Sequence, residues 1–303
     1  MRVAHLTSVD PEVVDHDLDR SFLEAAFTRR GIELVACAWE DGSVDWDGFD
    51  LVLVRSPWNY VEHEAAMRRF LDRFGESFRF HNPIGVIEWN LDKRYLRELA
   101  ALDVPVIPTT YVESRHGLDD ALAAVTATEV VVKPTVSAGS RLTGRFVTGD
   151  RRAHDLAEAI LDDGRSVMVQ PYLTSVDTES EYAVIVIDGQ IAHRARKAQI
   201  LDVGGTFTGG EYRELLTPAT PDADLDRVAL HAASACRDLA RQRGWLPDGE
   251  ELLYARYDIA RTDEGAAVLL EAELFEPALF LPVAPGTADV LAAAVERRIR
   301  RTV

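Results

Sequence analysis

The sequence predicts an α/β protein in three parts. These are an N-terminal domain with an open parallel βαβ sheet, a small central α+β domain, and a C-terminal domain built on an antiparallel sheet. Strands and helices alternate through the first 75 residues, a Ser/Gly-rich segment interrupts the strands of the middle, and two hairpin patterns dominate the last third. We place the domains at residues 1–90, 91–170 and 171–303.

The N-terminal domain is predicted from apolar strands that alternate with amphipathic helices. Residues 49–55 (FDLVLVR) form a nearly continuous apolar run, which is typical of a buried parallel strand. Open parallel sheets bind ligands beyond the carboxyl ends of their strands, so residues 56–60 are expected at a ligand site. The alternative for Trp58 and Tyr60 is that they cap the edge of the sheet. The predicted elements are residues 2–6, 18–30, 32–38, 49–55 and 63–74.

The central domain contains a Ser/Gly-rich loop between two strands. Gly139 and Gly144 have the spacing of a phosphate-binding loop, but Arg145 and Phe146 follow instead of Lys and Ser/Thr. A strand rather than a helix comes next, so that motif is excluded. The segment is either a mobile loop whose amides close over phosphates or an ordinary hairpin loop. The predicted elements are residues 91–102, 104–108, 118–125, 129–134, 145–147, 154–162 and 166–170.

The C-terminal domain begins with a hairpin whose turn is Asp188-Gly189. A two-residue turn there pairs residues whose numbers add to 377, so we expect Glu181 to face Arg196. Glu181 then either holds a ligand or only pairs with that arginine. Helices are expected at residues 225–243 and 287–300.

A second, acidic hairpin is the most informative pattern in the chain. If Glu264-Gly265 is its turn, Asp258 faces Glu271 and Arg256 faces Glu273. Side chains alternate along a strand, so all four then share one face. Carboxylate oxygens suit Mg²⁺, and a guanidinium suits phosphate oxygens. The alternative is a charged face in contact with water only. The opposite, core-facing set is Ala255, Tyr257, Ile259, Leu270, Ala272 and Leu274.

Composition narrows the class of protein. The net charge of −18 argues against nucleic-acid binding. No apolar run approaches the roughly 20 residues of a membrane span, and the N-terminus does not have the pattern of a signal peptide. Cys37 and Cys236 lack paired spacing, so we expect reduced thiols and a cytoplasmic location.

Several remaining residues have two interpretations when they are taken alone. Lys133, before the Ser/Gly loop, either points to solvent or aims an ammonium at a phosphate. Lys93 is either a helix-surface charge or a second phosphate ligand. Residues 170–173 (QPYL) are either a plain turn or a hinge whose backbone contacts an adenine edge.

The order of these features resembles the ATP-grasp superfamily of carboxylate–amine ligases. Lysine, lysine before a glycine-rich loop, hinge, acid, basic strand, Arg-x-Asp and Glu-x-Glu follow one another from residue 91 to the C-terminus. The βαβ pattern before them matches the domain that usually precedes this fold. Such enzymes use ATP to phosphorylate a carboxylate, and an amine then displaces the phosphate. The resemblance implies ATP and two Mg²⁺ ions as cofactors.

The resemblance also assigns roles to individual residues. Arg256, Lys133 and the lid residues Gly139 and Ser140 are expected to act in catalysis. Many members have Asn where Glu273 stands, so this chain carries an additional acid. The expected metal ligands are Asp258, Glu271 and Glu273, and the expected ATP-binding residues are Lys93, Lys133, Ser137, Gly139, Gln170, Pro171, Tyr172, Leu173 and either Glu181 or Asp177 as the ribose acid.

Within the superfamily, three elements resemble the cycloserine-synthesising type, O-ureido-D-serine cyclo-ligase. They are Arg-Ser-Pro-Trp-Asn-Tyr from Arg55, Trp-Asn-x-Asp-Lys-x-Tyr-Leu from Trp89, and Glu-x-Glu-x-x-x-Pro from Glu271. There the nitrogen of the substrate closes a five-membered ring onto the activated carboxyl. The expected substrate-binding residues are Arg55, Ser56, Trp58, Asn59, Tyr60, Arg194, Arg196, Lys197 and Glu276, with the loop at 204–210 nearby.

Other functions remain open at this point. One is an intermolecular ligase of amino acids or dipeptides, or one similar to glutathione synthetase. A second is a non-catalytic nucleotide-binding module, and a third is a kinase on the same scaffold. The expected partner is a small amino-acid-like molecule rather than nucleic acid or membrane, and family habit suggests a homodimer.

Overall fold

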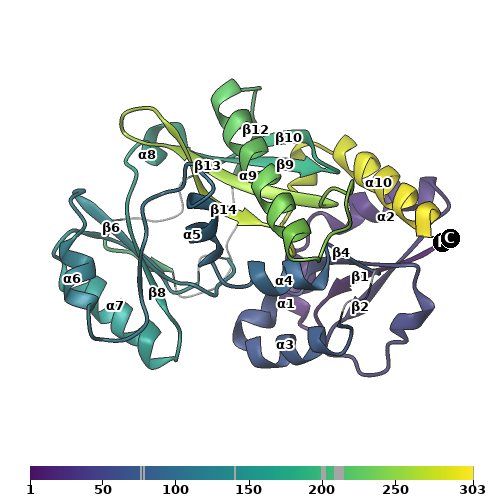
Figure 1. The fold of residues 1–303 in the computed structure, drawn as a ribbon, viewed down its shortest axis with the longest axis horizontal. Helices are drawn as coiled ribbons and strands as arrows, with labels where there is room; N and C mark the ends of the chain where they lie inside the picture. The colour runs from purple at the N-terminus through teal and green to yellow at the C-terminus, as the bar shows by residue number, and fades with distance from the viewer. Residues whose placement is uncertain (76, 78, 140, 199–202, 208–214, 303) are drawn as a thin grey trace.

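Three sheets form three lobes in the computed structural model of the chain (Figure 1). The structure describes residues 1–75, 77, 79–139, 141–198, 203–207 and 215–302. Strands and helices from distant parts of the sequence meet between the lobes. Among the described helices, none combines the length and apolar character that crossing a membrane needs.

The N-terminal lobe is an open parallel sheet, as the sequence predicts, and its four strands lie in the order β2-β1-β3-β4. Strand β3 is buried at every position because helices and the neighbouring lobe cover both faces. Four elements, α1, η1, η2 and β4, were not predicted. The elements are β1 (Arg2–Thr7), α1 (Pro11–His16), α2 (Arg20–Arg29), β2 (Glu33–Ala38), η1 (Trp46–Gly48), β3 (Leu51–Ser56), η2 (Trp58–Glu62), α3 (Glu64–Asp72) and β4 (Phe80–His81).

The helix expected from residue 91 to 102 is shorter, and a further helix precedes it. The two are α4 (Ile84–Asn90) and α5 (Tyr95–Ala100), and Lys93 lies in the turn between them. Residues 104–108 run extended as predicted, and Val106 forms a single bridge with Leu269 of the C-terminal sheet. This connection fastens the linker between lobes to the sheet that carries the acidic hairpin.

The central lobe is an antiparallel sheet in the order β11-β7-β6-β8-β5, with two helices against it. Strand β11 comes from beyond residue 170 and pairs with β7, so the sheet extends past the predicted boundary of this domain. Figure 1 shows this lobe apart from the N-terminal one, on the far side of the C-terminal sheet. The elements are β5 (Thr110–Val112), α6 (Leu118–Ala123), β6 (Glu129–Pro134), β7 (Thr143–Val147), α7 (Arg151–Asp162), β8 (Val167–Pro171) and β11 (Thr206–Phe207).

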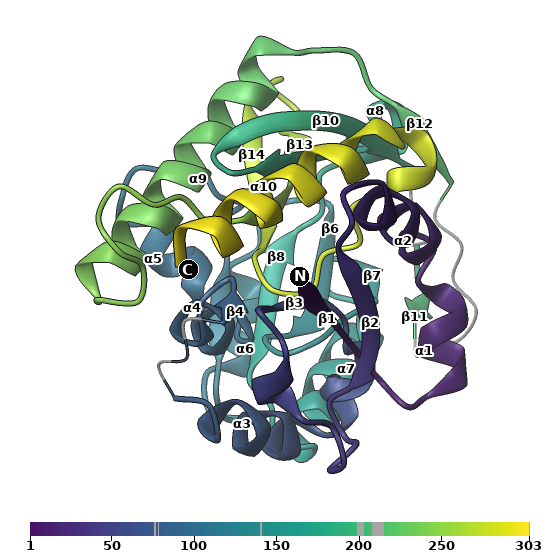
Figure 2. The ribbon, with the colours of Figure 1, turned by 90° about the vertical axis from the view of Figure 1, so that its right-hand side faces the viewer.

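The C-terminal lobe is an antiparallel sheet in the order β12-β10-β9-β13-β14. Helix α9 packs its apolar stripe on one face, and α10 lies with α2 over part of the other (Figure 2). The uncovered part of that second face points toward the central lobe. The elements are α8 (Val176–Glu179), β9 (Glu181–Ile187), β10 (Gln190–Lys197), β12 (Leu216–Pro218), α9 (Ala223–Gln242), β13 (Tyr254–Arg261), β14 (Ala267–Glu273), η3 (Leu281–Val283) and α10 (Gly286–Thr302).

Candidate active site

The acidic hairpin β13–β14 has the pairing that the sequence predicts. Arg256 lies opposite Glu273, and Asp258 lies opposite Glu271. All four side chains lie on the face that α9 leaves free, because Ala255, Tyr257 and other alternate residues pack against that helix. Three carboxylates and one guanidinium therefore gather on one face, as expected.

The turn of this hairpin differs from the prediction. The Gly265 amide donates to the Thr262 carbonyl, and the Thr262 amide donates to the Ala266 carbonyl, so the loop has one residue more than Glu264-Gly265 alone. Gly265 adopts φ of 88°, which suits the last position of such a loop. A bulge at Leu270 absorbs the shift and restores the predicted pairing.

The longer turn places Leu270 on the opposite face from the one expected, and the bulge then puts Glu271 on that same face beside it. Leu270 was expected in the core under α9, but Leu269 lies there instead and is fully buried. Leu270 joins Tyr172, Val176 and Ala260 in a small apolar cluster beside the charged residues. We call this cluster the apolar patch; Val131 and Leu173 pack against it. The bulge therefore places an apolar surface next to the carboxylates.

Asp258 is the centre of the charged face and is 3% exposed. Its oxygens lie 2.9 and 3.1 Å from nitrogens of Arg256, and 2.8 Å from Lys197 Nζ. Burial alone raises a carboxyl pKa, but the two cations outweigh burial and lower the pKa of Asp258 to about 2. Asp258 is therefore held as a carboxylate, which is the form that can bind a metal ion.

The prediction for strand β10 is wrong in its register. The turn Asp188-Gly189 forms as expected, but a bulge at Ala192 shifts the pairing, and Lys197 rather than Arg196 faces Glu181. The same bulge exchanges the faces of all later residues. Lys197 Nζ lies 3.2 Å from Glu181 Oε2 and points into the site.

Arg194 and Arg196 consequently lie on the α9 side of the sheet, away from the carboxylates. Arg194 forms a two-bond ion pair with Asp226 of α9, at 2.5 and 2.6 Å. Arg196 donates to the Glu179 carbonyl and lies over the ring of Tyr182. Neither arginine lies on the face of the carboxylates, and Lys197 is the basic residue of this strand that reaches the site.

Two further lysines enter the site from the other lobes. Lys93 Nζ donates to the Ser137 carbonyl at 2.7 Å and lies 3.1 Å from Glu271 Oε1. Lys133 on β6 makes no ion pair with a described residue. Burial lowers the pKa of Lys133, and Lys93 and Lys197 add to that effect, whereas the charges of Glu271 and Glu181 oppose it. The site thus contains an ammonium that makes no ion pair with a described residue, with two carboxylates and two other cations near it.

The hinge after β8 borders the apolar patch. Tyr172 and Leu173 contribute directly to the patch, and the Tyr172 amide donates to the Glu129 carbonyl of β6. The Gln170 side chain is used internally, because its amide donates to Thr109 Oγ1 at 2.8 Å. Pro171 ends the strand with its backbone opposite Val130.

The structure separates the two candidates for the ribose acid. Asp177 receives two bonds from Arg145, both 2.8 Å, and a third from the Tyr172 hydroxyl at 2.5 Å. Glu181 lies on the free face of the C-terminal sheet, where it pairs with Lys197. Glu181 is therefore the acid that faces the site, and Asp177 fastens the central sheet to the hinge.

The side chains of the segment after β3 point in two directions. Trp58 Nε1 donates to the Glu276 carbonyl at 2.9 Å, and the Tyr60 hydroxyl donates to Glu276 Oε1 at 2.8 Å. Asn59 points elsewhere, because it bonds Trp39 and Glu40 at the end of β2. The Asn59 side chain therefore lies on the β2 side of the segment, whereas Trp58 and Tyr60 adjoin the site.

Arg55 and Ser56 lie beneath this segment rather than at an open surface. Arg55 is 2% exposed, donates to the Pro277 carbonyl at 2.5 Å and lies 3.5 Å from Asp19. Ser56 is fully buried and donates to Asp17 at 2.8 Å, next to His5. Both residues lie beneath the segment, and the Arg55 Nε and Nη1 atoms are buried without a hydrogen-bond partner among the described residues.

The Ser/Gly loop of the central lobe approaches the same space. Ser137 is buried, and its carbonyl accepts a hydrogen bond from the Lys93 ammonium. Gly139 is exposed and has a φ of 58°. The predicted catalytic residue Ser140 lies outside the described residues, as does part of the loop at 204–210. Arg141 forms an ion pair with Glu62 of the N-terminal lobe, so the loop spans the opening between lobes.

Sequence reasoning missed the residues that fix the hairpin in place. Asn82 and Asn90 bond backbone groups of β13 and of the stretch at the end of β14, at 2.5–2.8 Å. Asp19 accepts from the Leu279 and Leu281 amides. Asn90 stands within the Trp-Asn-x-Asp-Lys pattern, which was a usable signal. Asn82 and Asp19 gave no signal in the sequence, because their hydrogen-bond partners are about 170 to 260 residues away.

The carboxylates fit a divalent cation. Burial raises the pKa of Glu273 well above its usual range, and Glu276, Glu271 and Asp258 add to the effect, although the Arg256 charge opposes it. Crowded buried acids of this kind are stabilised when a cation binds among them. Hard oxygen donors are the ligands that Mg²⁺ prefers. Asp258, Glu271 and Glu273 are therefore able to hold Mg²⁺.

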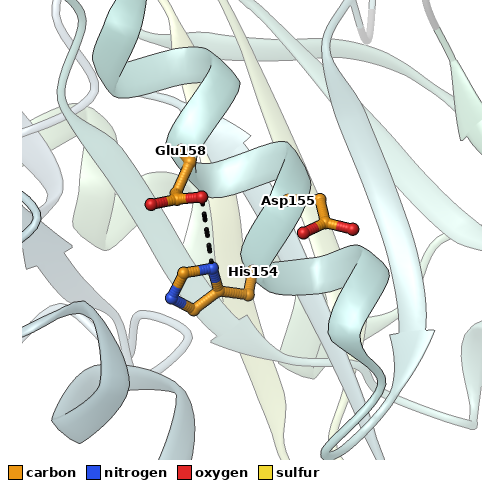
Figure 3. A group of neighbouring side chains, drawn as sticks. All are labelled: His154, Asp155 and Glu158. Carbon is orange, nitrogen blue, oxygen red and sulfur yellow. Dashed lines mark ion pairs between the residues drawn. The ribbon is translucent and has the colours of Figure 1, made fainter.

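A second acidic group lies far from this face, on the outer helix of the central lobe. His154, Asp155 and Glu158 follow one another on α7, with the histidine and the glutamate joined by an ion pair (Figure 3). His154 also pairs with Asp119 of α6. The ion pairs of His154 are thus made with neighbouring surface residues, and this group is not part of the site.

Comparison with known proteins defines first the class and then the family. The fold matches that of ATP-grasp proteins. It superposes on D-alanine–D-alanine ligase from Bacillus anthracis complexed with ATP with a TM-score of 0.67 and 14% identity, covering 100% of this chain and 98% of that one. For a RimK domain ATP-grasp protein from Sphaerobacter thermophilus the TM-score is 0.64 at 18% identity, with 98% of each chain covered.

A more similar relative sets the family. The chain is 36% identical over 296 residues to the cycloserine biosynthesis protein DcsG of Streptomyces lavendulae, covering 95% of both chains. It superposes on a crystal structure of D-cycloserine synthetase DcsG with a TM-score of 0.88 and 33% identity, covering 99% of this chain and 100% of that one. The family model of the DcsG N-terminal domain matches residues 3–82. The chain belongs to the DcsG family of ATP-grasp ligases, which confirms the predicted resemblance.

Proposed function

We propose that this protein is an ATP- and Mg²⁺-dependent ligase that closes a ring within its substrate. It activates the carboxyl group of O-ureido-D-serine as an acyl phosphate, and a nitrogen of the same molecule then displaces phosphate. Release of the carbamoyl group, which consumes one water, completes the conversion to D-cycloserine. The membership of the DcsG family supports the choice of substrate.

One observation carries the proposal. Three carboxylates and four cations, from the turn between α4 and α5, the central sheet and the C-terminal sheet, converge on the free face of the C-terminal sheet, and Lys133 among them makes no ion pair with a described residue. A triphosphate and a carboxylate repel each other, so a site that joins them needs many positive groups. The converging residues are Lys93, Lys133, Lys197, Arg256, Asp258, Glu271 and Glu273.

We assign the nucleotide to the space between the central and C-terminal lobes. The adenine lies on the apolar patch against the hinge, and Glu181 holds the ribose hydroxyls. Lys93 and Lys133 bind phosphate oxygens, while the Ser/Gly loop closes over them and excludes water that hydrolyses acyl phosphates. The position of Glu181 between the patch and Asp258 supports this order along the sheet.

We assign the metal ions to Asp258, Glu271 and Glu273, with two ions as the number expected. Bound Mg²⁺ supplies positive charge to the transferred phosphoryl group. Arg256 lies between Asp258 and Glu273, and it donates hydrogen bonds to the phosphoryl group during the transfer. Lys197 holds Asp258 in its charged form before the ion binds.

The substrate is expected on the N-terminal side of these groups. Trp58, Tyr60 and Glu276 border this space, and Pro277 and Ala278 accept bonds there from Arg55 and Arg256. The strands of the N-terminal parallel sheet have their carboxyl ends here, and open α/β sheets bind ligands beyond those ends. An intermolecular ligation of two amino acids is the alternative on the same site. A homodimer also stays a prediction.

The test is a turnover assay with the purified protein, Mg²⁺, ATP and O-ureido-D-serine. We expect ADP release together with a cyclised product in mass spectra. Addition of hydroxylamine traps an acyl phosphate as a hydroxamate, which a kinase acting on a hydroxyl group does not yield. Absence of ADP release over a panel of ureido, aminooxy and ordinary amino acids contradicts the ligase, and a product joining two amino acids contradicts ring closure.

A further inference from the structure

Glu276 differs from every other acid in the site in how its charge is compensated. Asp258, Glu271 and Glu273 each form an ion pair with a lysine or arginine. Glu276 is 7% exposed, yet its carboxylate forms no ion pair with a described residue. Its Oε1 accepts a bond from the neutral Tyr60 hydroxyl at 2.8 Å. The remaining oxygen accepts no bond from a described residue.

Glu276 is held firmly by the N-terminal lobe. Its carbonyl accepts from Trp58, and the next carbonyl, that of Pro277, accepts from Arg55. Tyr60 is 2% exposed and packs edge-on against Phe275, with ring centroids 5.1 Å apart. The carboxylate is therefore fixed in position at the boundary between the lobes rather than free to rotate.

The charged groups around Glu276 come from three directions. Burial raises the pKa of Glu276, and Glu271 on β14 adds to this; Tyr60, Lys93 and Arg256 oppose it. Glu273 is a second acid near Glu276, because the charge of Glu276 raises the pKa of Glu273. The net direction is upward from the ordinary value of a glutamate. A carboxylate with a raised pKa is a stronger proton acceptor.

The proposed reaction releases a proton that some group must accept. The attacking nitrogen carries N–H, and its hydrogen becomes acidic as the bond to the carbonyl carbon forms. Lys93 and Lys197 are engaged with carboxylates, and the other acids of the site, Asp258, Glu271, Glu273 and Glu181, are each paired with a cation. Among the described residues of the site, Glu276 is the acid that remains available.

We propose that Glu276 is the general base of the ligation step, and that Tyr60 is the positioning residue that orients it. This inference rests on the proposed function. The nitrogen lone pair forms the new bond to the carbonyl carbon, the N–H proton passes to the Glu276 carboxylate, and the carbon–oxygen bond to phosphate breaks. Phosphate leaves with that electron pair, and the protonated Glu276 returns its proton to water.

The experiment separates the two halves of the reaction in the intact protein. Glu276→Gln keeps the size of the side chain but cannot accept a proton. We expect hydroxamate formation with added hydroxylamine to stay within about threefold of wild type, because activation of the carboxyl does not use Glu276. Formation of the cyclised product falls about 100-fold or more, which is the usual range for loss of a general base. Glu264→Gln, in the exposed hairpin turn, is the matched control and leaves both rates unchanged.

A second variant tests the positioning role through pH. The Tyr60 hydrogen bond lowers the pKa of Glu276, so Tyr60→Phe raises it. The acidic limb of the kcat profile for ring closure then moves to higher pH, by about half a unit or more. Circular dichroism and the melting temperature show whether the variant is folded.

The outcomes decide between the possibilities. If wild type yields neither ADP nor hydroxamate, the proposed ligase function fails before the base is tested. If wild type is active and Glu276→Gln still cyclises at the wild-type rate, the base assignment is overturned. A raised KM for the amino acid with an unchanged kcat and an unchanged acidic limb also overturns it, because it assigns Glu276 to substrate binding alone.

Discussion

The two hairpins of the C-terminal sheet both contain a bulge, with opposite consequences for prediction. In β9–β10 the bulge at Ala192 lies between a two-residue turn and the charged end of the strand, so every later side chain changes face. In β13–β14 the bulge at Leu270 compensates for a turn that is one residue longer, so the charged residues pair as simple counting predicts.

The comparison shows what makes the site. Without the first bulge, Arg196 faces Glu181 and Lys197 points toward α9. Without the second, the register of the longer turn continues along the strand, so Glu271 and Glu273 point toward α9. Each bulge therefore decides which charged residues lie on the free face of the sheet, and the strand sequences alone do not reveal either of them.

The largest effect is expected from the residue that both hairpins converge on. Asp258→Asn removes a metal ligand and the partner of Lys197 and Arg256. We expect kcat to fall at least ~100-fold, because the charge that Mg²⁺ supplies to the transferred group is weakened. Steady-state ADP release measures this. Asp263→Asn in the turn is the control, and equal rates in both variants contradict the metal assignment.

The next largest effect tests which face of the sheet the side chains of Arg196 and Lys197 occupy in β10. Lys197→Met is expected to lower kcat/KM about 10- to 100-fold, because Asp258 and Glu181 lose their common cation. Arg196→Met, one residue earlier and on the opposite face, is expected to change it less than about threefold. If the arginine variant is the more damaged of the two, the register of this hairpin in solution is the unbulged one.

A smaller pair of effects tests the bulge in β14. Leu270→Ala removes part of the apolar patch and is expected to raise the KM for ATP about 5- to 20-fold with little loss of stability. Leu269→Ala creates a cavity in the core and is expected to lower the free energy of unfolding by about 2–5 kcal/mol with the KM for ATP unchanged. Urea unfolding and ATP titrations distinguish the two, and an exchange of the two outcomes contradicts the bulge.

The smallest expected effect is a pH dependence of stability at His193, next to the first bulge. Burial lowers the pKa of His193 from 6.5 to about 4, and the Arg194 charge adds to this. The unfolded chain binds a proton below about pH 6.5 and the folded chain does not, so stability falls between pH 6.5 and 4, by at most about 3 kcal/mol. Urea unfolding at several pH values measures the fall, which His193→Gln is expected to reduce; an unchanged slope in that variant contradicts the assignment.

The sequence was sufficient for the elements with strong local signals. The buried run of β3, the glycine turn at Asp188-Gly189 and the acids of β13–β14 were all predicted from short patterns. The family resemblance then ordered them along the chain. The strands and turns depend on neighbours within a few residues, whereas the acidic pairing agrees with simple counting because the bulge at Leu270 compensates for the longer turn.

The rest depends on contacts between distant segments. Whether Asn59 turns toward Glu40, or Arg55 lies beneath Pro277, is decided by packing between lobes and not by the local sequence. Bulges also escape prediction, because one additional residue in a strand costs little where the neighbouring core accepts it. The predicted register of β10 was wrong for this reason.

The most direct test is a calorimetric titration of a non-hydrolysable ATP analogue into the wild-type protein, with and without Mg²⁺. The account predicts one binding site that requires Mg²⁺, is weakened at least tenfold by Glu271→Gln and is unaffected by Arg196→Met. Binding that is independent of Mg²⁺, or equally strong in the Glu271 variant, would contradict the placement of magnesium-bound triphosphate on the acidic hairpin.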